Sequence, residues 1–290
     1  MRADWFRRHR SLRIAPNDSV VEIGSGYDPC WRSDLLIDKY VADSSERPGG
    51  YASLLIDRPF IVGDAQWLPF SDKSIDFLIA RNILEHIIDV DSFLEEMMRA
   101  GRRGYITTPS SLSEKLSGWK KHVWFVSIDD GILKLEAKEK ALYDRQLSRI
   151  FHRLYEQDRA FRCFYQKNCH LFVVEYHWED HIRYHVEGDP ALLQAIKVTQ
   201  AEFDLETTRA ALAHRRRHGG IRQRAESLAH SLVSRNGIGR IDDIVTKLAC
   251  PLCRGSLTIT APAVHCVHCG ARYPSIVGVP ILVREAADHG

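Results

Sequence analysis

Short apolar runs alternate with turns and amphipathic stretches along the first part of the chain. Strand-like runs occur at 19–23, 35–38, 60–62, 76–80 and 104–108. The stretch 85–100 places its apolar residues on one face of a helix, at Ile87, Val90, Phe93, Leu94 and Met97. Strands that alternate with helices are typical of a mostly parallel sheet whose faces are both covered by helices. The pattern therefore predicts an α/β domain built around such a sheet.

The pattern changes after residue 110. Asp129-Asp-Gly131, between the apolar runs 123–126 and 132–135, predicts a β-hairpin. Residues 136–168 are rich in Lys, Glu, Arg, Gln and Leu, so we expect them to be helical. The runs 170–177 and 182–186 predict two more strands.

The last hundred residues fall into two parts. Residues 191–235 are expected to be helical, with the basic run 214–218 at a break before Gly219-Gly220. From Leu248 onward the chain turns to short strands, prolines and cysteines. These changes predict a first domain over 1–190 with an insert at about 110–170, a helical linker over 191–245 and a small domain over 246–290.

Composition narrows the class of protein. Hydrophobic residues make up 44% and charged residues 27% of the 290 residues, which suits a globular core with a solvated surface. The net charge of +2 gives no global basic field that would attract nucleic acid or an anionic membrane. The N-terminus has no apolar stretch after its charges, and no apolar run approaches the roughly 20 residues that span a bilayer. We therefore expect a cytoplasmic protein without a membrane span.

The stretch Val20-Val-Glu-Ile-Gly-Ser-Gly26 carries the first chemical signal. A glycine turn at the carboxyl end of a first strand lets the backbone pass close to a ligand. A nicotinamide enzyme would also use such a turn, but its pyrophosphate disfavours a nearby carboxylate. Glu22 stands two residues before the first glycine, and an acidic side chain suits a cofactor that carries a sulfonium cation and an amino group.

Further motifs follow in order: Gly63-Asp-Ala-Gln-Trp-Leu-Pro-Phe70, Asp72-Lys-Ser-Ile-Asp76, Leu84-Glu-His86 and Glu96-Met-Met-Arg99. Over roughly 19–109 the sequence resembles class I S-adenosylmethionine-dependent methyltransferases of the ubiquinone/menaquinone type, which implies a Rossmann-like sheet. The resemblance implies that Gly24 and Gly26, with Ser25 between them, pass under the cofactor's methionine part. It also implies ribose hydrogen bonds to Asp38, an adenine site at Asp64 and Ala65, and Asn82 near the methionine end.

The chain departs from this family in two places. A third glycine is absent, since Asp28 and Pro29 follow Gly26-Tyr27. Only residues 27–34 separate the turn from the second strand, which is short for a parallel crossover. Either the first helix is reduced to a turn or the second strand lies elsewhere, and the role of Asp38 depends on which holds.

The sequence says less about the methyl acceptor than about the cofactor. His86 and Asp89, and His122 farther along, are candidate bases because histidine and carboxylate can take a proton from a hydroxyl or amine. Leu-Glu-His recurs in the family whatever the acceptor, so His86 has a structural explanation as well. We predict substrate contacts for His122 and Trp124, although packing of the hairpin against the helical insert is the better single explanation of Trp124. The chain lacks the Asn/Asp-Pro-Pro-aromatic motif after Ala80, which argues against base or glutamine N-methylation.

Four cysteines form two paired motifs, Cys250-Pro-Leu-Cys253 and Cys266-Val-His-Cys269. Two such turns can point four thiolates at one ion, and a closed tetrahedral shell makes a structural zinc site. Two disulfides or a redox pair are the alternative, which a cytosolic setting disfavours. The remaining cysteines, Cys30, Cys163 and Cys169, are scattered.

The segment from Leu248 to Leu282 resembles the small zinc-ribbon activators of methyltransferases. That resemblance implies a ribbon that docks on its own or a neighbouring methyltransferase domain. The leading prediction is methyl transfer to a hydroxyl or amine of a small molecule or a carbohydrate, including a glycan precursor. The alternatives are methylation of tRNA, rRNA or a translation factor, and a non-catalytic scaffold with a methyltransferase fold.

Overall fold

The computed structural model of the chain describes residues 12–42, 54–119, 121–138, 145–190, 203–214, 243–260 and 262–288. The chain forms two compact units. The core unit comprises residues 13–79, 91–104 and 201–290, and the insert unit comprises residues 1–12, 80–90 and 105–200. In the described residues, no helix combines the length and apolar composition that crossing a membrane requires.

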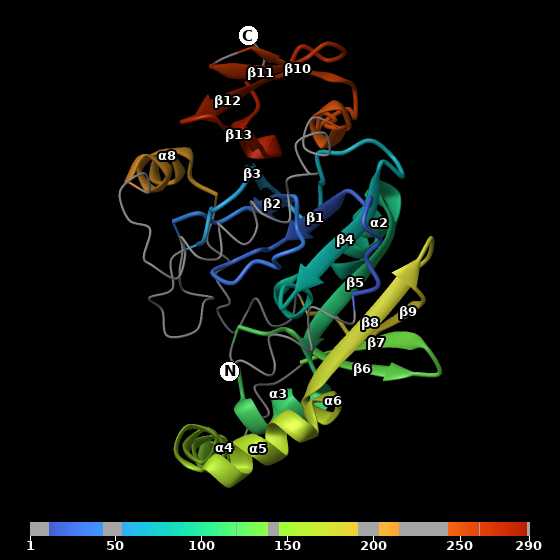
Figure 1. Cartoon of the computed structure of the whole chain (residues 1–290), viewed down its shortest axis with the longest axis vertical. Helices are drawn as coiled ribbons and strands as arrows, with labels where there is room; N and C mark the ends of the chain where they lie inside the picture. Colours follow the sequence, from blue (N-terminus) through green and yellow to red (C-terminus); the bar gives the residue numbers. More distant parts are fainter. Residues whose placement is uncertain are drawn as a thin grey trace. The chain divides into compact units, whose positions relative to one another are not determined.

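The core unit is built around a β-sheet. Its strands are β1 (Val20–Ile23), β2 (Leu35–Asp38), β3 (Phe60–Gly63), β4 (Ile75–Arg81) and β5 (Gly101–Pro109), the last two running on into the insert unit. The sheet order is β3-β2-β1-β4-β5, and β1, β2 and β3 pair in parallel (Figure 1). All residues of β1 and β3 are buried, as expected for parallel strands with covered faces. This sheet confirms the Rossmann-like fold expected from the sequence.

The crossover from β1 to β2 contains no helix. Residues 24–34 form turns, and β2 begins at Leu35 with Leu36 opposite Glu22. The first helix of the fold is therefore reduced to turns, which decides between the two alternatives left open by the sequence. Asp38 stands at the end of β2 as expected.

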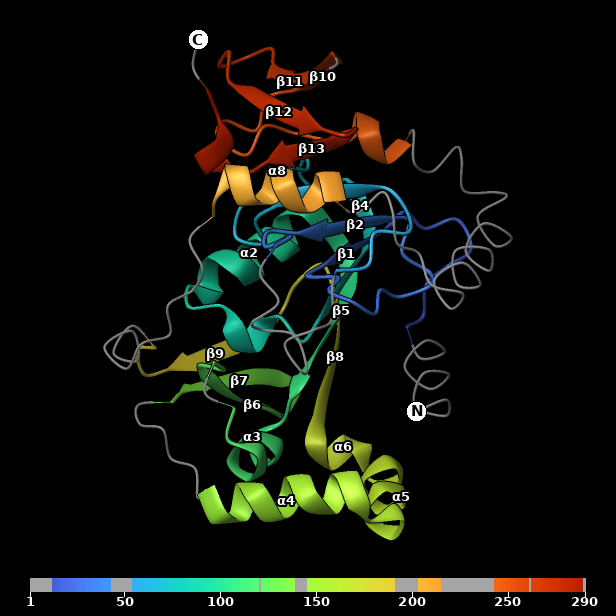
Figure 2. The same ribbon diagram turned by 90° about the vertical axis from the view of Figure 1, so that its left-hand side faces the viewer.

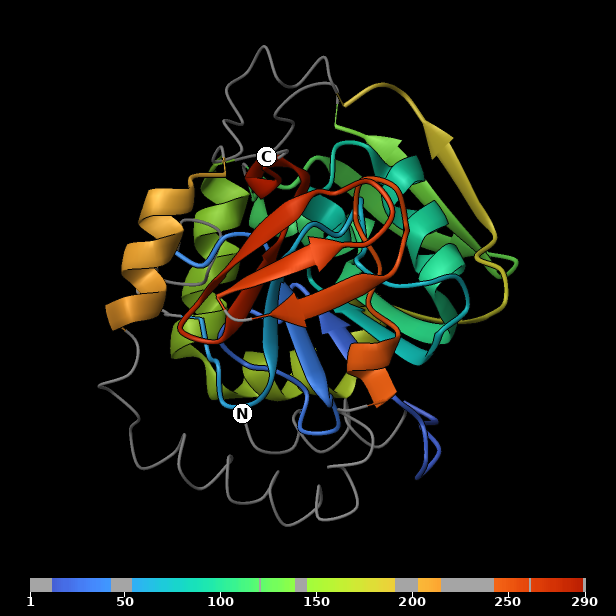
Figure 3. The same ribbon diagram turned by 90° about the horizontal axis from the view of Figure 1, so that it is seen from above.

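The C-terminal segment adds four strands to the same sheet. They are β10 (Leu257–Thr260), β11 (Ala263–Cys266), β12 (Arg272–Ile276) and β13 (Val279–Leu282), and a 3₁₀ turn, η5 (Arg284–Ala286), follows. β10 to β13 pair antiparallel, as the orange and red strands of Figure 3 show. β13 pairs in parallel with β3, with Ile281 opposite Val62. Ile281 and Val283 belong to the same buried cluster as Leu36, Phe60 and Val62. One apolar core therefore joins this segment to the parallel sheet.

Two helices of the core unit differ from the sequence-based expectation. The helix expected over 85–100 begins only at Val90, as α2 (Val90–Ala100), because Ile87 is extended after the short turn η2 (Leu84–His86). Of the helical stretch expected over 191–235, the described part is α8 (Leu205–His214), whose Leu212 packs in the core cluster. The basic run 215–218 lies outside the described residues.

The insert unit carries a second, three-stranded sheet. β6 (Trp124–Asp129) and β7 (Ile132–Ala137) form the expected hairpin, and β9 (Tyr184–Glu187) pairs in parallel with β7. Asp130 and Gly131 both have positive φ, the backbone that a tight two-residue hairpin turn requires. β8 (Val173–Glu179) is hydrogen-bonded to β5.

The helices of the insert unit are α3 (Ser111–Ser117), α4 (Arg145–Gln157), α5 (Arg159–Lys167) and α6 (Cys169–Phe172). Figure 2 shows α4 and α5 on one side of α3 and α6, with the three-stranded sheet on the other. The helix expected over 136–168 is thus interrupted, because β7 continues to Ala137 and Asp158 caps a new helix. The strand expected over 170–177 starts only at Val173, since the preceding residues complete a helical turn.

Candidate functional site

The glycine turn after β1 has the backbone of a close-approach site. Gly24 and Gly26 have φ of 65° and 56°, a conformation that other residues rarely adopt. The N–H of Gly24 donates to the carbonyl of Ile37 at 2.8 Å, which fixes the turn against β2. A Cβ added to Gly26 would meet only the carbonyl oxygen of Gly24, at 4.0 Å, so this position faces open space. The turn can therefore admit a ligand against its backbone.

Ser25, between the two glycines, carries an unusual hydroxyl. Its residue is only 4% exposed, and in the described structure its Oγ has no hydrogen-bond partner. A buried hydroxyl without a partner costs about 1–3 kcal/mol. The polar groups of a bound cofactor would remove that cost, so the turn fits the group that the sequence predicts there.

Glu22 has a structural task beside this turn. Its side chain is 1% exposed, and one carboxylate oxygen accepts hydrogen bonds from the N–H of Cys30 at 2.6 Å and the hydroxyl of Ser33 at 2.9 Å. Glu22 thereby holds the helix-free crossover 24–34 in place. Asp38 joins the same arrangement from the end of β2, because its Oδ2 accepts from the N–H of Gly26 at 3.3 Å.

Lys39, directly after β2, brings a cation to the predicted adenine site in the loop after β3. Oδ2 of Asp64 lies 2.6 Å from Nζ of Lys39, and Oδ1 accepts from the N–H of Gln66 at 2.9 Å. Lys39 also contacts Glu285, at 2.8 Å, and Ala65 is buried beside Asp64. Burial lowers the pKa of Lys39, but the hydrogen bonds and charges of Asp64 and Glu285 outweigh it and raise the pKa above its usual value.

The C-terminal segment supplies a second contact to this loop. The guanidinium of Arg284 lies 4.0 Å from the centre of the Trp67 ring, within the range of a cation–π interaction. Lys39, Arg284 and Glu285 were not among the residues predicted from the sequence. Their role depends on the pairing of β13 with β3, which brings residue 285 to the loop after β3.

A second group of candidate functional side chains lies in the insert unit. Nδ1 of His122 is 2.5 Å from Oε1 of Glu114, and Lys138 forms an ion pair with the other carboxylate oxygen of Glu114. The carboxylate of Glu114 is fully buried, and burial raises its pKa. Hydrogen bonding to His122 and the charges of His122 and Lys138 outweigh burial, so the pKa of Glu114 is lowered overall.

Two further rings surround His122. The ring of His86 meets it edge-on at 4.6 Å, and the ring of Trp119 stacks on it at 5.6 Å and 17°. Glu85, His86 and His122 each have one oxygen or nitrogen atom able to bind a metal, and these three atoms lie within 4.8 Å of one another. The carboxylate of Glu85 accepts a hydrogen bond from the hydroxyl of Thr108. Trp119 is 47% exposed, so a flat aromatic surface adjoins the histidine pair.

Trp124 and Asn82 occupy different settings. Trp124 is 1% exposed and its indole N–H donates to the carbonyl of Ile87 at 2.7 Å, so packing of the hairpin accounts for this side chain. Asn82 follows β4 with φ of 51°, is exposed, and donates its backbone N–H to Thr107 at 2.8 Å. A left-handed non-glycine residue at a strand end is a feature that often accompanies function.

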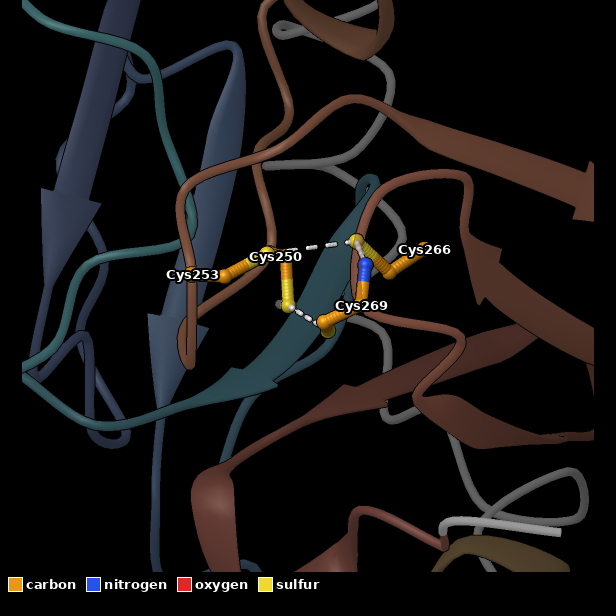
Figure 4. A group of neighbouring side chains, drawn as sticks. All are labelled: Cys250, Cys253, Cys266 and Cys269. Carbon is orange, nitrogen blue, oxygen red and sulfur yellow. Dashed lines mark hydrogen bonds between the residues drawn. The ribbon is translucent and has the colours of Figure 1, made fainter.

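The four paired cysteines converge in the core unit (Figure 4). Sγ of Cys250 lies 3.8 Å from Sγ of Cys269, and Sγ of Cys253 lies 3.4 Å from Sγ of Cys266. All four are free thiols in the structure, and S–S separations near 3.8 Å suit a tetrahedral ion with Zn–S of about 2.3 Å. The donor set therefore fits a zinc ion.

The backbone around these thiols supports the same conclusion. Sγ of Cys266 accepts from the N–H groups of His268, at 3.4 Å, and Cys269, at 3.5 Å. Burial raises the pKa of Cys266, but these two hydrogen bonds and those from neighbouring thiols lower it to about 7. A Cβ on Gly255 would lie 2.6 Å from the Cβ of His268, so only glycine allows the two cysteine turns to approach this closely.

Comparison with known proteins defines the class of the core. A family model described as a methyltransferase domain matches residues 23–106, which include the glycine turn, Asp38, Asp64 and Leu84-Glu-His86. This stretch is thus a methyltransferase domain of the class I, Rossmann-like type. No curated protein matches the chain.

Solved structures with similarity to the chain include three from bacteria and archaea. The YcgJ protein of Bacillus subtilis is 18% identical, with 38% of this chain and 52% of that chain covered and a TM-score of 0.29. A complex of the Haloferax volcanii Trm112 methyltransferase activator with a methyltransferase gives 21% identity, coverage of 37% and 50%, and a TM-score of 0.26. A SAM-dependent methyltransferase of Methanosarcina mazei is 16% identical, with 43% of this chain and 71% of that chain covered and a TM-score of 0.28. The chain spans about half the length of the first two.

Proposed function

We propose that this chain is an S-adenosylmethionine-dependent methyltransferase that methylates a hydroxyl or amine of a small molecule or a carbohydrate. The methyltransferase domain over 23–106 supports the proposed activity. The observation that carries the proposed acceptor is the pairing of His122 with the buried carboxylate of Glu114, beside the exposed Trp119. The motif order over 19–109 favours the ubiquinone/menaquinone type of this class.

The cofactor would be held mainly by residues of the core unit. Gly24 and Gly26 would hold the methionine part against the backbone, with the hydroxyl of Ser25 hydrogen-bonded to it. Asp38 would accept from the ribose hydroxyls, because each carboxylate oxygen can accept more than one hydrogen bond. Asp64 would accept from the adenine amine, with Lys39 retained by Glu285. Asn82 is proposed for the methionine end.

The bound cofactor supplies an electrophilic methyl group on a sulfonium. The chain must then position the acceptor and receive its proton. An ionised carboxylate only accepts hydrogen bonds, so Glu114 fixes the proton of His122 on Nδ1 and leaves Nε2 as the base. Nε2 could accept the proton that the acceptor hydroxyl or amine loses when its oxygen or nitrogen takes the methyl group, while the carbon–sulfur bond of the cofactor breaks and S-adenosylhomocysteine leaves. His86, edge-on to His122, would confine the acceptor.

The acceptor class follows from Trp119. Its exposed ring stacks on His122, and flat aromatic surfaces bind sugar or aromatic rings through their apolar faces. A ring-shaped acceptor with a hydroxyl would therefore lie on Trp119 with that hydroxyl directed at His122. Trp124 is buried and would support the hairpin from beneath.

The four cysteines would hold a structural zinc ion. A closed shell of four thiolates leaves no position for a substrate, so the ion would stabilise the C-terminal strands. Since β13 pairs with β3 of the same chain, we propose that the ribbon docks in cis on its own methyltransferase domain.

A transfer assay tests the proposal. Zinc-loaded protein would be incubated with methyl-labelled cofactor and separate pools of monosaccharides, lipid-free glycans, phenols, tRNA and rRNA. Label should appear in a sugar or ring acceptor and disappear with His122→Asn, while His170→Asn, at an exposed site, should retain activity. Label in RNA alone would support the RNA alternative. No cofactor binding would leave the scaffold alternative.

A further inference from the structure

The helices α4 and α5 expose large apolar side chains in a regular stripe. Leu147, Ile150 and Leu154 recur at helical spacing along α4, and Phe164 continues the apolar surface on α5. Ile150 and Phe164 are each 50% exposed. A monomeric surface rarely gathers such side chains without a partner. We propose that the helix pair α4–α5 is a docking surface for an anionic lipid bilayer.

The exposed stripe is not needed for packing the two helices together. Beneath it, the rings of Phe151 and Phe161 meet edge-on at 5.6 Å, and Tyr165 stacks on Phe172 at 4.3 Å. These rings tie α4 and α5 to α6 and form an apolar layer of their own. Phe164 is half exposed and also contacts the rings of Phe161, at 6.3 Å, and Phe172, at 6.5 Å, so it lies at the edge of this layer. Leu147, Ile150 and Leu154 are additional to the layer, and the helices present them on a packed support.

Charge identifies the kind of partner. Residues 145–167 contain six Lys or Arg against two acidic residues, an excess larger than the net charge of +2 for the whole chain. Arg149, Arg153 and Arg159 are exposed. A shallow hollow is lined by two apolar side chains, two arginines and one carboxylate, with Gln157 and Ala160 between them: Ile150, Leu154, Arg153, Arg159 and Asp158. Apolar and cationic side chains thus share one surface.

This combination matches the way amphipathic helices lie in a membrane interface. Such helices have a strongly apolar face, an Arg-rich polar face and a low overall hydrophobicity, and they bury the apolar face at the level of the lipid headgroups. Each Arg near an anionic bilayer contributes about 1 kcal/mol to binding. α4 and α5 both have this character, and their outer sides are covered neither by α3 nor by α6, as Figure 2 shows.

Other occupants fit less well. A second copy would bring the same excess of positive charge against itself, which opposes association through this face. Nucleic acid would be attracted by the arginines, but Ile150, Leu154 and Phe164 would be placed against phosphates. The anionic bilayer alone accepts both the apolar stripe and the arginines.

Co-sedimentation with vesicles tests the proposal. Full-length, zinc-loaded protein should bind vesicles of equal parts phosphatidylserine and phosphatidylcholine, and should remain in the supernatant with pure phosphatidylcholine. Ile150→Asp should lower the partition coefficient by about tenfold or more, because insertion of the side chain is lost. Ile259→Asp is the matched control, since Ile259 is 49% exposed on β10, and should bind like the unaltered protein.

Charge variants complete the test. Arg153→Gln should weaken binding to the anionic vesicles roughly fivefold, and Arg209→Gln, at an exposed site on α8, should not. The proposal is wrong if the anionic vesicles do not bind the protein, or if Ile150→Asp binds them unchanged. A dimer in light scattering that Ile150→Asp dissociates would also overturn it, because the stripe would then be an interface between copies.

Discussion

Nδ1 of His122 lies 2.5 Å from Oε1 of Glu114, and the two residues come from the loop before β6 and from helix α3. The contact gives the imidazole a fixed orientation through Nδ1, and Nε2 is the nitrogen that we propose for the acceptor. Ser110 caps α3, and Gly118 ends it in the left-handed conformation, so the backbone on both sides of Glu114 is well determined. A rigid carboxylate is therefore positioned to orient the proposed base.

Kinetics of His122 and Glu114 variants test this assignment. His122→Asn should lower kcat roughly 100-fold or more, since general-base catalysis contributes about 10²–10⁴. Glu114→Gln should lower kcat less, because the base remains but its orientation is weakened. Glu206→Gln, at an exposed carboxylate, should leave kcat unchanged. Equal rates for all three variants would show that the pair is only structural.

Stability against pH tests the charge state of Glu114. Its folded pKa lies below the ordinary 4.5, because the contacts with His122 and Lys138 outweigh burial. An ionised Glu114 therefore stabilises the fold above about pH 4.5, and this contribution is lost as the pH falls through the folded pKa. The difference in Tm between the unaltered protein and Glu114→Gln should be largest near neutral pH and should shrink in acid. A difference that is constant with pH would contradict the ion pair.

The sequence predicted the strands of the core better than the side chains that contact the candidate site residues. Leu35–Asp38 was placed correctly because a buried parallel strand leaves a continuous apolar run. The absence of a helix before it was not decidable, since it depends on Glu22 reaching Cys30 and Ser33 across the crossover. Glu114 and Lys138 were missed for a similar reason, because they are 24 positions apart and look like ordinary surface charges until the hairpin closes.

The start of α2 shows the limit of periodicity. Ile87 continues the apolar face of the helix in the sequence, yet its backbone is extended and its carbonyl accepts from Trp124. A tertiary contact thus overrides a local pattern. The cysteine pairs are the opposite case, since two Cys-x-x-Cys turns define their own geometry and the structure brings all four thiols together.

Lys39→Met should destabilise the core unit. Lys39 bridges Asp64 and Glu285, and its loss leaves the carboxylate of Asp64, which is 12% exposed, without a cation. We expect the free energy of unfolding to fall by about 1–3 kcal/mol in denaturant titration. Lys134→Met is the matched control, because Lys134 pairs with Asp129 at an exposed hairpin, where a change within about 0.5 kcal/mol is expected. Equal effects of the two substitutions would contradict a structural bridge at Lys39.

Removing zinc should destabilise the sheet as well as the ribbon. β13 pairs with β3, and Ile281 packs with Leu36, so loss of the C-terminal strands exposes the edge of the parallel sheet. Chelation or Cys266→Ser should lower Tm, by roughly 2–4 °C for each kcal/mol lost. Cys163→Ser, at an exposed cysteine outside the cluster, should not change Tm. An unchanged Tm after verified zinc removal would show that the ribbon does not support the core.

Calorimetric titration of the zinc-loaded protein with S-adenosylmethionine and S-adenosylhomocysteine tests the central claim most directly. We predict binding of both, with a dissociation constant on the order of 1–100 μM. Asp64→Ala should abolish it, and Asp129→Ala, at the exposed hairpin turn, should not. Absence of binding by the intact, folded protein would contradict the proposal that this chain is a methyltransferase.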